Sequence, residues 1–214
     1  MASILAVTFE ADGVTLPGDM ALPDGARGIV VFAHGSGSSR LSPRNKAVAN
    51  GLTRAGFGTL LFDLLTLDEE RTDTRDAALR FDIALLSRRL TGAIGWLDEQ
   101  AVTRGVPLGL FGASTGAAAA LATAARRPGQ VRAVVSRGGR PDLAGEALGQ
   151  VRAPVLLIVG EQDTRVLELT EAAQRDLPSS ELAVVEGAGH LFEEPGALDQ
   201  VTALAADWFT RHLA

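Results

Sequence analysis

Gly112-Ala113-Ser114-Thr115-Gly116 is the stretch of sequence that decides the predicted fold. It follows the apolar run Val106–Phe111, which is typical of a strand, and opens the Ala-rich segment Thr115–Arg127, which is typical of a helix. A serine between small residues at such a turn matches the G-x-S-x-G nucleophile elbow, in which the side-chain oxygen stands clear of the sheet. The N-terminus of the following helix favours negative charge beside the serine. We therefore expect Ser114 to be a nucleophile.

Two further residues suit a catalytic triad with Ser114. Asp163 follows the apolar strand-like run Val155–Val159, and His190 follows the next strand-like run, Glu181–Val185. Because the carboxyl ends of parallel strands share one edge of a sheet, all three side chains are expected at the same edge. The order Ser, Asp, His along the chain is the order of the nucleophile-elbow fold. We therefore expect His190 to be the base and Asp163 the acid that orients it.

Three other residues are alternatives or neighbours of this triad. Asp142 follows the strand-like run Val131–Ser136 and is an alternative acid. His34 directly follows another strand-like run, so we expect its side chain to brace a loop rather than to remove a proton. His212 is near the end of the last helix-like segment and is expected at the surface.

The rest of the chain alternates strand-like and helix-like segments, with two strands at the start. This order predicts an α/β protein with a mostly parallel sheet of about eight strands and helices on both faces. The expected strands are Ile4–Glu10, Val14–Leu22, Gly28–Ala33, Gly58–Phe62, Val106–Phe111, Val131–Ser136, Val155–Val159 and Glu181–Val185. The expected helices are one from Ser42-Pro43 to near Gly56, one that ends near Gln100 after a polar stretch at Asp68–Asp76, and then Thr115–Arg127, Leu143–Leu148, Glu168–Asp176 and Pro195–Leu213.

The first two strands alternate apolar and polar residues, and Asp12-Gly13 between them predicts an antiparallel hairpin. No break in composition marks a second domain, so we expect residues 1–214 to form a single domain. The interval between Ser136 and Val155 is too short for an inserted cap domain.

Two more sets of residues are expected at the same edge of the sheet. Ser36, in the loop after the strand Gly28–Ala33, and Thr115 are expected to present backbone N–H groups to a reaction oxyanion. Arg137 and Arg140 follow a central strand and could bind a carboxylate or phosphate of the substrate. Their alternative role is that of solvated loop charges, or of partners for Asp142.

Composition excludes several classes of function. The net charge of −6 argues against a nucleic-acid partner, which would require a basic face. Cysteine is absent, so disulfides, thiolate metal sites and a cysteine nucleophile are excluded. Neither a signal peptide nor a membrane-spanning run is visible, so we expect a cytoplasmic protein without a membrane partner. The sequence gives no indication of the oligomeric state.

The chain resembles the α/β-hydrolase superfamily and, within it, the lidless dienelactone-hydrolase-like group. The resemblance rests on Gly112–Gly116, the His34-Gly35 loop, Gly160–Asp163 and Gly189-His190, and it covers nearly all of the chain. It implies a hydrolase that needs no metal or organic cofactor. One departure is important, because the dienelactone hydrolases use a cysteine nucleophile and this chain has serine. The resemblance therefore implies the fold and the triad but not the dienelactone substrate.

We therefore expect a serine hydrolase that takes a small-molecule acyl substrate and forms an acyl-enzyme on Ser114. The sequence leaves open whether that substrate is a carboxylic ester, a thioester or a lactone. One alternative is a non-catalytic small-molecule binding protein with the same fold. A nucleotide-binding protein is a weaker alternative, because the chain contains neither G-x-x-x-x-G-K-[ST] nor G-x-G-x-x-G.

Overall fold

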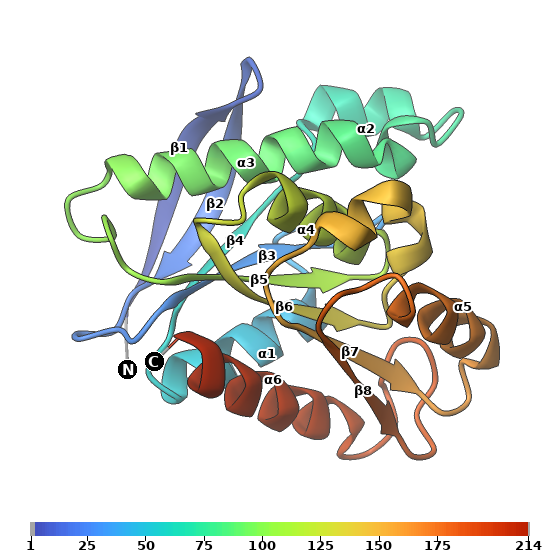
Figure 1. Ribbon diagram of the computed structural model, residues 1–214. Helices are drawn as coiled ribbons and strands as arrows, with labels where there is room; N and C mark the ends of the chain where they lie inside the picture. Colours follow the sequence, from blue (N-terminus) through green and yellow to red (C-terminus); the bar gives the residue numbers. More distant parts are fainter. Residues whose placement is uncertain (1–2, 214) are drawn as a thin grey trace.

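A computed structural model of the chain describes residues 3–213, which form an eight-stranded sheet between two layers of helices (Figure 1). The strands lie side by side in the order β1-β2-β4-β3-β5-β6-β7-β8. Their bounds are β1 Ile4–Ala11, β2 Val14–Ala21, β3 Ile29–Ala33, β4 Gly58–Phe62, β5 Leu108–Ala113, β6 Val131–Arg137, β7 Val155–Gly160 and β8 Ser180–Val185. The pairs β1–β2 and β2–β4 are antiparallel and the other pairs are parallel. The predicted sheet is confirmed.

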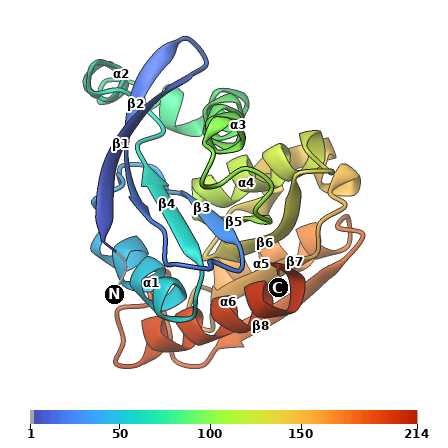
Figure 2. The same ribbon diagram turned by 90° about the vertical axis from the view of Figure 1, so that its left-hand side faces the viewer.

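Helices cover both faces of this sheet, and the described residues contain no separate cap domain (Figure 2). The helices are α1 Pro43–Arg54, α2 Leu67–Asp73, α3 Ile83–Glu99, α4 Thr115–Arg126, α5 Thr164–Gln174 and α6 Ala197–Leu213, with the 3-10 segments η1 Leu79–Phe81 and η2 Pro141–Gln150. Figure 2 shows α1 and α6 together on one face, and α3 and α4 on the other. None of the helices in this part of the chain is both long and apolar enough to cross a membrane.

The central strands are apolar throughout because each of their faces is covered. Along β3, Ile29, Val31 and Ala33 belong to the hydrophobic cluster that also contains residues of α3 and α4. Val30 and Phe32 point the other way, into the cluster that contains residues of α1 and α6. Successive side chains of a strand alternate between faces, so a strand between two layers must be apolar at every position.

The hairpin at the start of the sheet forms as predicted. Ala11 pairs with Val14 across the two-residue turn, in which Asp12 and Gly13 both have positive φ, 48° and 79°. A turn with positive φ at both positions matches the twist of an antiparallel pair.

Three local expectations differ from the structure. The polar stretch 68–76 contains the helix α2, because Thr66 and Glu69 form a reciprocal capping box at its start. Helix α5 begins at Thr164 rather than near residue 168, directly after Asp163 at its N-cap. The short helix expected at 143–148 is the 3-10 segment η2, which is interrupted at Gly145 with φ 54°.

The order in which the chain adds strands to the sheet reverses between β3 and β5. From β3 the chain passes to β4 on one side, and β5 to β8 then continue on the other side. Ala33 at the end of β3 is in register with Gly112 near the end of β5. Ligands of open α/β sheets bind at such a switch point, outside the carboxyl ends of the strands. The loops after β3 and β5 meet there.

Candidate active site

Ser114 occupies the sharp turn between β5 and α4. Its backbone has φ 51° and ψ −122°, and it is one of few described non-glycine residues with positive φ. Such a conformation costs on the order of 1–3 kcal/mol and persists only where the surroundings impose it. The strained serine turn predicted from the sequence is therefore present, with the side chain half-buried.

The two glycines of the motif are required by close packing around this turn. A Cβ atom at Gly112 would lie 2.4 Å from the Cα atom of Ala117, and one at Gly116 would lie 2.1 Å from the carbonyl oxygen of Ala33. Both separations are too short for any side chain. The glycines thus allow α4 to pack directly against the ends of β3 and β5, which fixes where Ser114 stands.

Asp163 and His190 are brought together from two different loops. Asp163 follows β7 and His190 follows β8, and the distance from His190 Nδ1 to Asp163 Oδ2 is 2.6 Å. The aspartate side chain is 14% exposed and the histidine side chain is 39% exposed. Because the carboxylate accepts the hydrogen bond from Nδ1–H, the other ring nitrogen, Nε2, is left free to accept a proton.

Ser114 and His190 line one cavity, which we call the nucleophile cavity. Its volume is about 240 Å³, and its walls also include Arg44, Asn45 and Arg137. Within residues 3–213 the Ser114 hydroxyl forms no hydrogen bond with the imidazole. Catalytic hydrogen bonds of this kind are often long in unliganded proteins and tighten when substrate binds.

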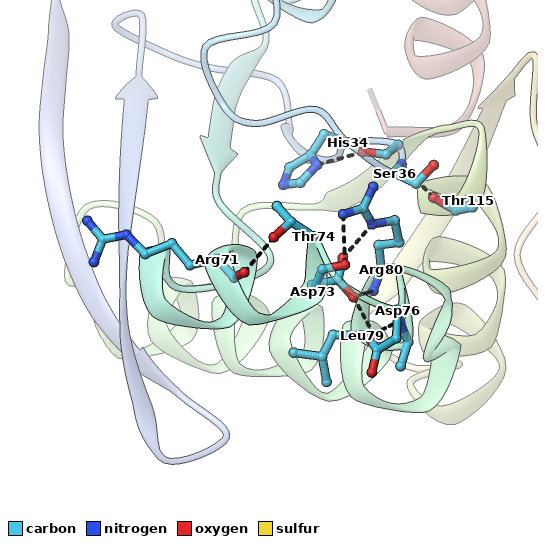
Figure 3. A network of polar contacts seen from close by, with 11 residues as sticks. His34, Ser36, Arg71, Asp73, Thr74, Asp76, Leu79, Arg80 and Thr115 are labelled. Carbon is cyan, nitrogen blue, oxygen red and sulfur yellow. Dashed lines mark hydrogen bonds and ion pairs between the residues drawn. The ribbon is translucent and has the colours of Figure 1, made fainter.

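The two residues expected to form an oxyanion hole lie next to each other. The backbone N–H of Ser36 donates to Thr115 Oγ1 (Figure 3), and the distance between the two atoms is 2.8 Å. Thr115 is the first residue of α4, so its own N–H is among those that a helix leaves without an intrahelical partner. In this arrangement the Ser36 amide already has an acceptor, which the sequence did not reveal.

His34 joins the loop after β3 to the segment that follows β4. Its Nδ1 lies 3.0 Å from the Gly35 carbonyl oxygen, and its Nε2 accepts the N–H of Leu64 at 3.0 Å. The side chain is 7% exposed, and this burial lowers the pKa of His34 from its usual value of 6.5. The expectation that His34 braces the loop is confirmed.

This lowered pKa predicts a contribution of His34 to acid sensitivity. The unfolded chain binds a proton near pH 6.5 and the folded chain does not, so stability is lost as the pH falls below that value. In His34→Gln, we expect the loss of unfolding free energy between about pH 7.5 and about pH 5.5 to be smaller by at most about 1.4 kcal/mol. Urea unfolding at both pH values measures it. An equal loss in both proteins would contradict the assignment, because the other histidines are unchanged.

A second, larger cavity of about 450 Å³ shares Ser36 with the nucleophile cavity, but neither Ser114 nor His190 lines it. Its apolar walls come from Leu41, Leu64, Leu65 and Leu86. Its polar walls include Glu70, Asp73 and Arg80, and Asp73 forms an ion pair with Arg80 (Figure 3). The sequence pattern does not indicate this cavity, because the segment that contains Glu70 and Asp73 is predicted as a polar stretch rather than as the helix α2.

The two arginines expected near the substrate have different surroundings. Arg137 is buried and lines the nucleophile cavity, whereas Arg140 lines neither cavity. Arg140 binds Asp142 through two hydrogen bonds of 2.8 and 2.7 Å. Asp142, the alternative acid, is therefore bound to Arg140, whereas Nδ1 of His190 contacts Asp163. Among the described residues no group of three or more His, Asp and Glu side chains could hold a metal ion.

Comparison with known proteins gives three kinds of match. The profile of the dienelactone hydrolase family matches residues 16–213. A curated Mycobacterium tuberculosis protein named "putative phosphoribosyl transferase" is 59% identical over 208 residues, which are 97% of this chain but only 46% of that protein. This chain thus spans about half the length of that relative. A Bradyrhizobium protein named "probable 2-oxo-3-(5-oxofuran-2-ylidene)propanoate lactonase" is 30% identical over 70% of this chain and 67% of its own length.

Solved structures share the fold. The crystal structure of a dienelactone hydrolase from Anabaena variabilis has a TM-score of 0.97 and 53% identity, and the match covers 100% of this chain and 99% of that one. Est1E from Butyrivibrio proteoclasticus has a TM-score of 0.80 at 15% identity, over 96% of this chain and 98% of its own. At 15% identity, the similarity to Est1E shows a shared fold only.

Proposed function

The chain belongs to the dienelactone hydrolase family, and from that premise we propose that it is a serine hydrolase acting on small carboxylic esters, thioesters or lactones. The observation that carries the proposal is the strained Ser114 turn in the same cavity as His190, whose Nδ1 contacts Asp163 at 2.6 Å. A nucleophile, a base and a group that orients the base are the parts that acyl transfer through a serine requires.

In the first step, Ser114 Oγ attacks the carbonyl carbon of the substrate while His190 Nε2 takes the hydroxyl proton. The carbonyl π electrons move to the carbonyl oxygen, which becomes an oxyanion. The imidazolium then gives its proton to the leaving oxygen or sulfur as the acyl bond breaks, which leaves an acyl-serine. Asp163 holds the ring in the required tautomer and stabilises its positive charge.

The oxyanion is stabilised by backbone N–H groups of the turn and the loop. Thr115 N–H, at the start of α4, supplies one donor, and the positive end of the helix dipole adds to it. Ser36 N–H supplies the other and is then shared between the oxyanion and the Thr115 hydroxyl, which accepts it at 2.8 Å in the free protein. Water deprotonated by His190 finally attacks the acyl carbon and releases Ser114 with its proton restored.

The names of the relatives bear on the substrate to different degrees. The lactonase name favours lactones among the possible acyl substrates, because opening a lactone is the same acyl transfer with the alcohol kept on the product. The transferase name describes a protein about twice as long, so it does not assign that activity to the half that this chain matches.

Covalent labelling tests the proposal directly. A fluorophosphonate phosphonylates a serine only where an adjacent base and oxyanion donors activate it. We expect the chain to gain the mass of one phosphonyl group, and peptide mapping to assign that group to Ser114. Ser114→Ala should gain nothing under the same conditions. A chain that is not labelled would instead favour a non-catalytic binding protein of the same fold, and equal labelling of Ser114→Ala would contradict the assignment of the nucleophile.

A further inference from the structure

Arg137, the last residue of β6, carries a buried guanidinium without an anionic partner. It is 7% exposed, and its Nε and Nη1 atoms have no hydrogen-bond partner among residues 3–213. Nη2 makes one long contact, 3.4 Å to the amide oxygen of Asn45. Burying an ion without a counter-charge costs several kcal/mol, so a fold rarely keeps such a group unless another molecule supplies the charge.

Among the described residues that line the nucleophile cavity, none is acidic, and Arg44 adds a second positive charge. Arg44, in the first turn of α1, pairs with the exposed Glu193 at 2.9 Å. The ring of Phe192 lies 5.9 Å from the Arg137 guanidinium carbon. Burial, followed by the proximity of Arg44, lowers the pKa of Arg137 to about 10, so it remains positive at neutral pH.

The position of this charge relative to His190 indicates which part of a substrate it faces. In the mechanism above, His190 gives its proton to the leaving oxygen, so the leaving group must lie on the side of the imidazole. Arg137 and His190 line the same cavity, and neither lines the larger one. The larger cavity has leucine walls and the carboxylate of Glu70, while Asp73 and Arg80 form an ion pair. It therefore suits a neutral acyl group.

We propose that Arg137 and Arg44 form an anion subsite for the leaving group, so that the substrate is an ester of an alcohol that bears a carboxylate or a phosphate. This inference rests on the proposed function, since it assigns a substrate class to the same serine. The planar fork of Arg137 can donate two parallel hydrogen bonds to either anion, and Arg44, in the first turn of α1, adds a second cation. Arg140 has no part in it, because its Nε and Nη2 are bound to the Asp142 carboxylate and it lines neither cavity.

Matched pairs of esters test whether the enzyme recognises a negative charge on the leaving group or on the acyl group. The anionic leaving groups are those of para-acetoxybenzoate and para-acetoxyphenyl phosphate, and their neutral counterpart is methyl para-acetoxybenzoate. Monophenyl succinate has its charge on the acyl side, with phenyl butyrate as the neutral match. The preference for the anionic leaving group is the kcat/KM of an anionic ester divided by the kcat/KM of its neutral counterpart. We expect this ratio to fall about 10²-fold in Arg137→Gln, because a buried charge-assisted pair is lost. The intrinsic reactivities of the esters cancel when the ratio is compared between variants.

Further variants make the result specific. Arg44→Gln should lower the same preference about tenfold, since its side chain is 32% exposed and its charge is more hydrated than that of Arg137. Arg140→Gln, a matched arginine of the same loop, should leave the preference unchanged. Comparing the loss for the carboxylate ester with the loss for the phosphate ester in Arg137→Gln shows which anion the subsite prefers. An unchanged preference in Arg137→Gln would overturn the proposal. So would a greater fall, in the same variant, of the kcat/KM ratio of monophenyl succinate to phenyl butyrate.

A binding measurement separates this inference from the proposed function. Calorimetric titration of Ser114→Ala with para-hydroxybenzoate and with para-hydroxyphenyl phosphate requires no catalysis. We expect at least one of them to bind about 10²-fold more tightly than methyl para-hydroxybenzoate, and the difference to vanish when Arg137→Gln is added. If binding shows this difference but no ester is hydrolysed through Ser114, the proposed function fails while the anion subsite stands. If hydrolysis depends on Ser114 but neither anion binds preferentially, the subsite fails alone.

Discussion

Ser114→Ala is expected to lower kcat for ester hydrolysis by roughly 10⁴–10⁶-fold, because the covalent route is lost and only binding and oxyanion stabilisation remain. The fold should be unaffected. The Ser114 side chain makes no capping hydrogen bond to α4, and alanine meets the same backbone strain at φ 51° as serine does. We therefore expect the unfolding free energy to change by less than about 0.5 kcal/mol. Steady-state kinetics on para-acetoxybenzoate, together with urea unfolding, measures both quantities.

Ser38→Ala is the matched control for this prediction. Ser38 lines both cavities but has no place in the proposed mechanism. The kcat of Ser38→Ala should remain within about threefold of the wild-type value. If Ser114→Ala kept a tenth or more of the wild-type kcat with a normal unfolding curve, another group would have to be the nucleophile. That result would contradict the proposed function.

Much of the fold could be predicted because its signals are local. The apolar runs of β3, β5 and β7 follow from burial on both faces, and the turn at Ser114 follows from glycines at which a Cβ atom would clash. The neighbouring positions of Asp163 and His190 follow from a sheet in which successive parallel strands end at one edge. In each case a short stretch of sequence carries the signal, even where the contact that explains it, such as that of Gly116 with Ala33, joins distant residues.

The remainder depends on contacts between segments far apart in the chain. Arg137 and Arg140 are three residues apart and indistinguishable in the sequence, yet one is buried beside Asn45 of α1 and the other is neutralised by Asp142. The pairing of the Ser36 amide with the Thr115 hydroxyl likewise joins the loop after β3 to the first residue of α4. No periodicity or motif encodes the side-chain orientations that decide these cases.

Asp163→Asn is expected to lower kcat by about 10⁴-fold. The 2.6 Å contact requires Nδ1 to carry the proton, since a carboxylate can only accept. An asparagine amide at that position can instead donate to Nδ1 and leave the proton on Nε2. In that tautomer the ring cannot accept the proton of Ser114, so the base is present but in the wrong form. The pH dependence of kcat, together with its magnitude, measures this change.

Asp142→Asn is the decisive comparison, because Asp142 is the other aspartate that the sequence offers as the acid. Its carboxylate binds Arg140 through two hydrogen bonds, and that arginine lines neither cavity. Breaking this partly exposed pair should cost less than about 1 kcal/mol of stability and change kcat by no more than about threefold. A large loss of kcat in Asp142→Asn with a small loss in Asp163→Asn would reassign the acid. The histidine would then have to turn from Asp163 toward the loop after β6 when substrate binds.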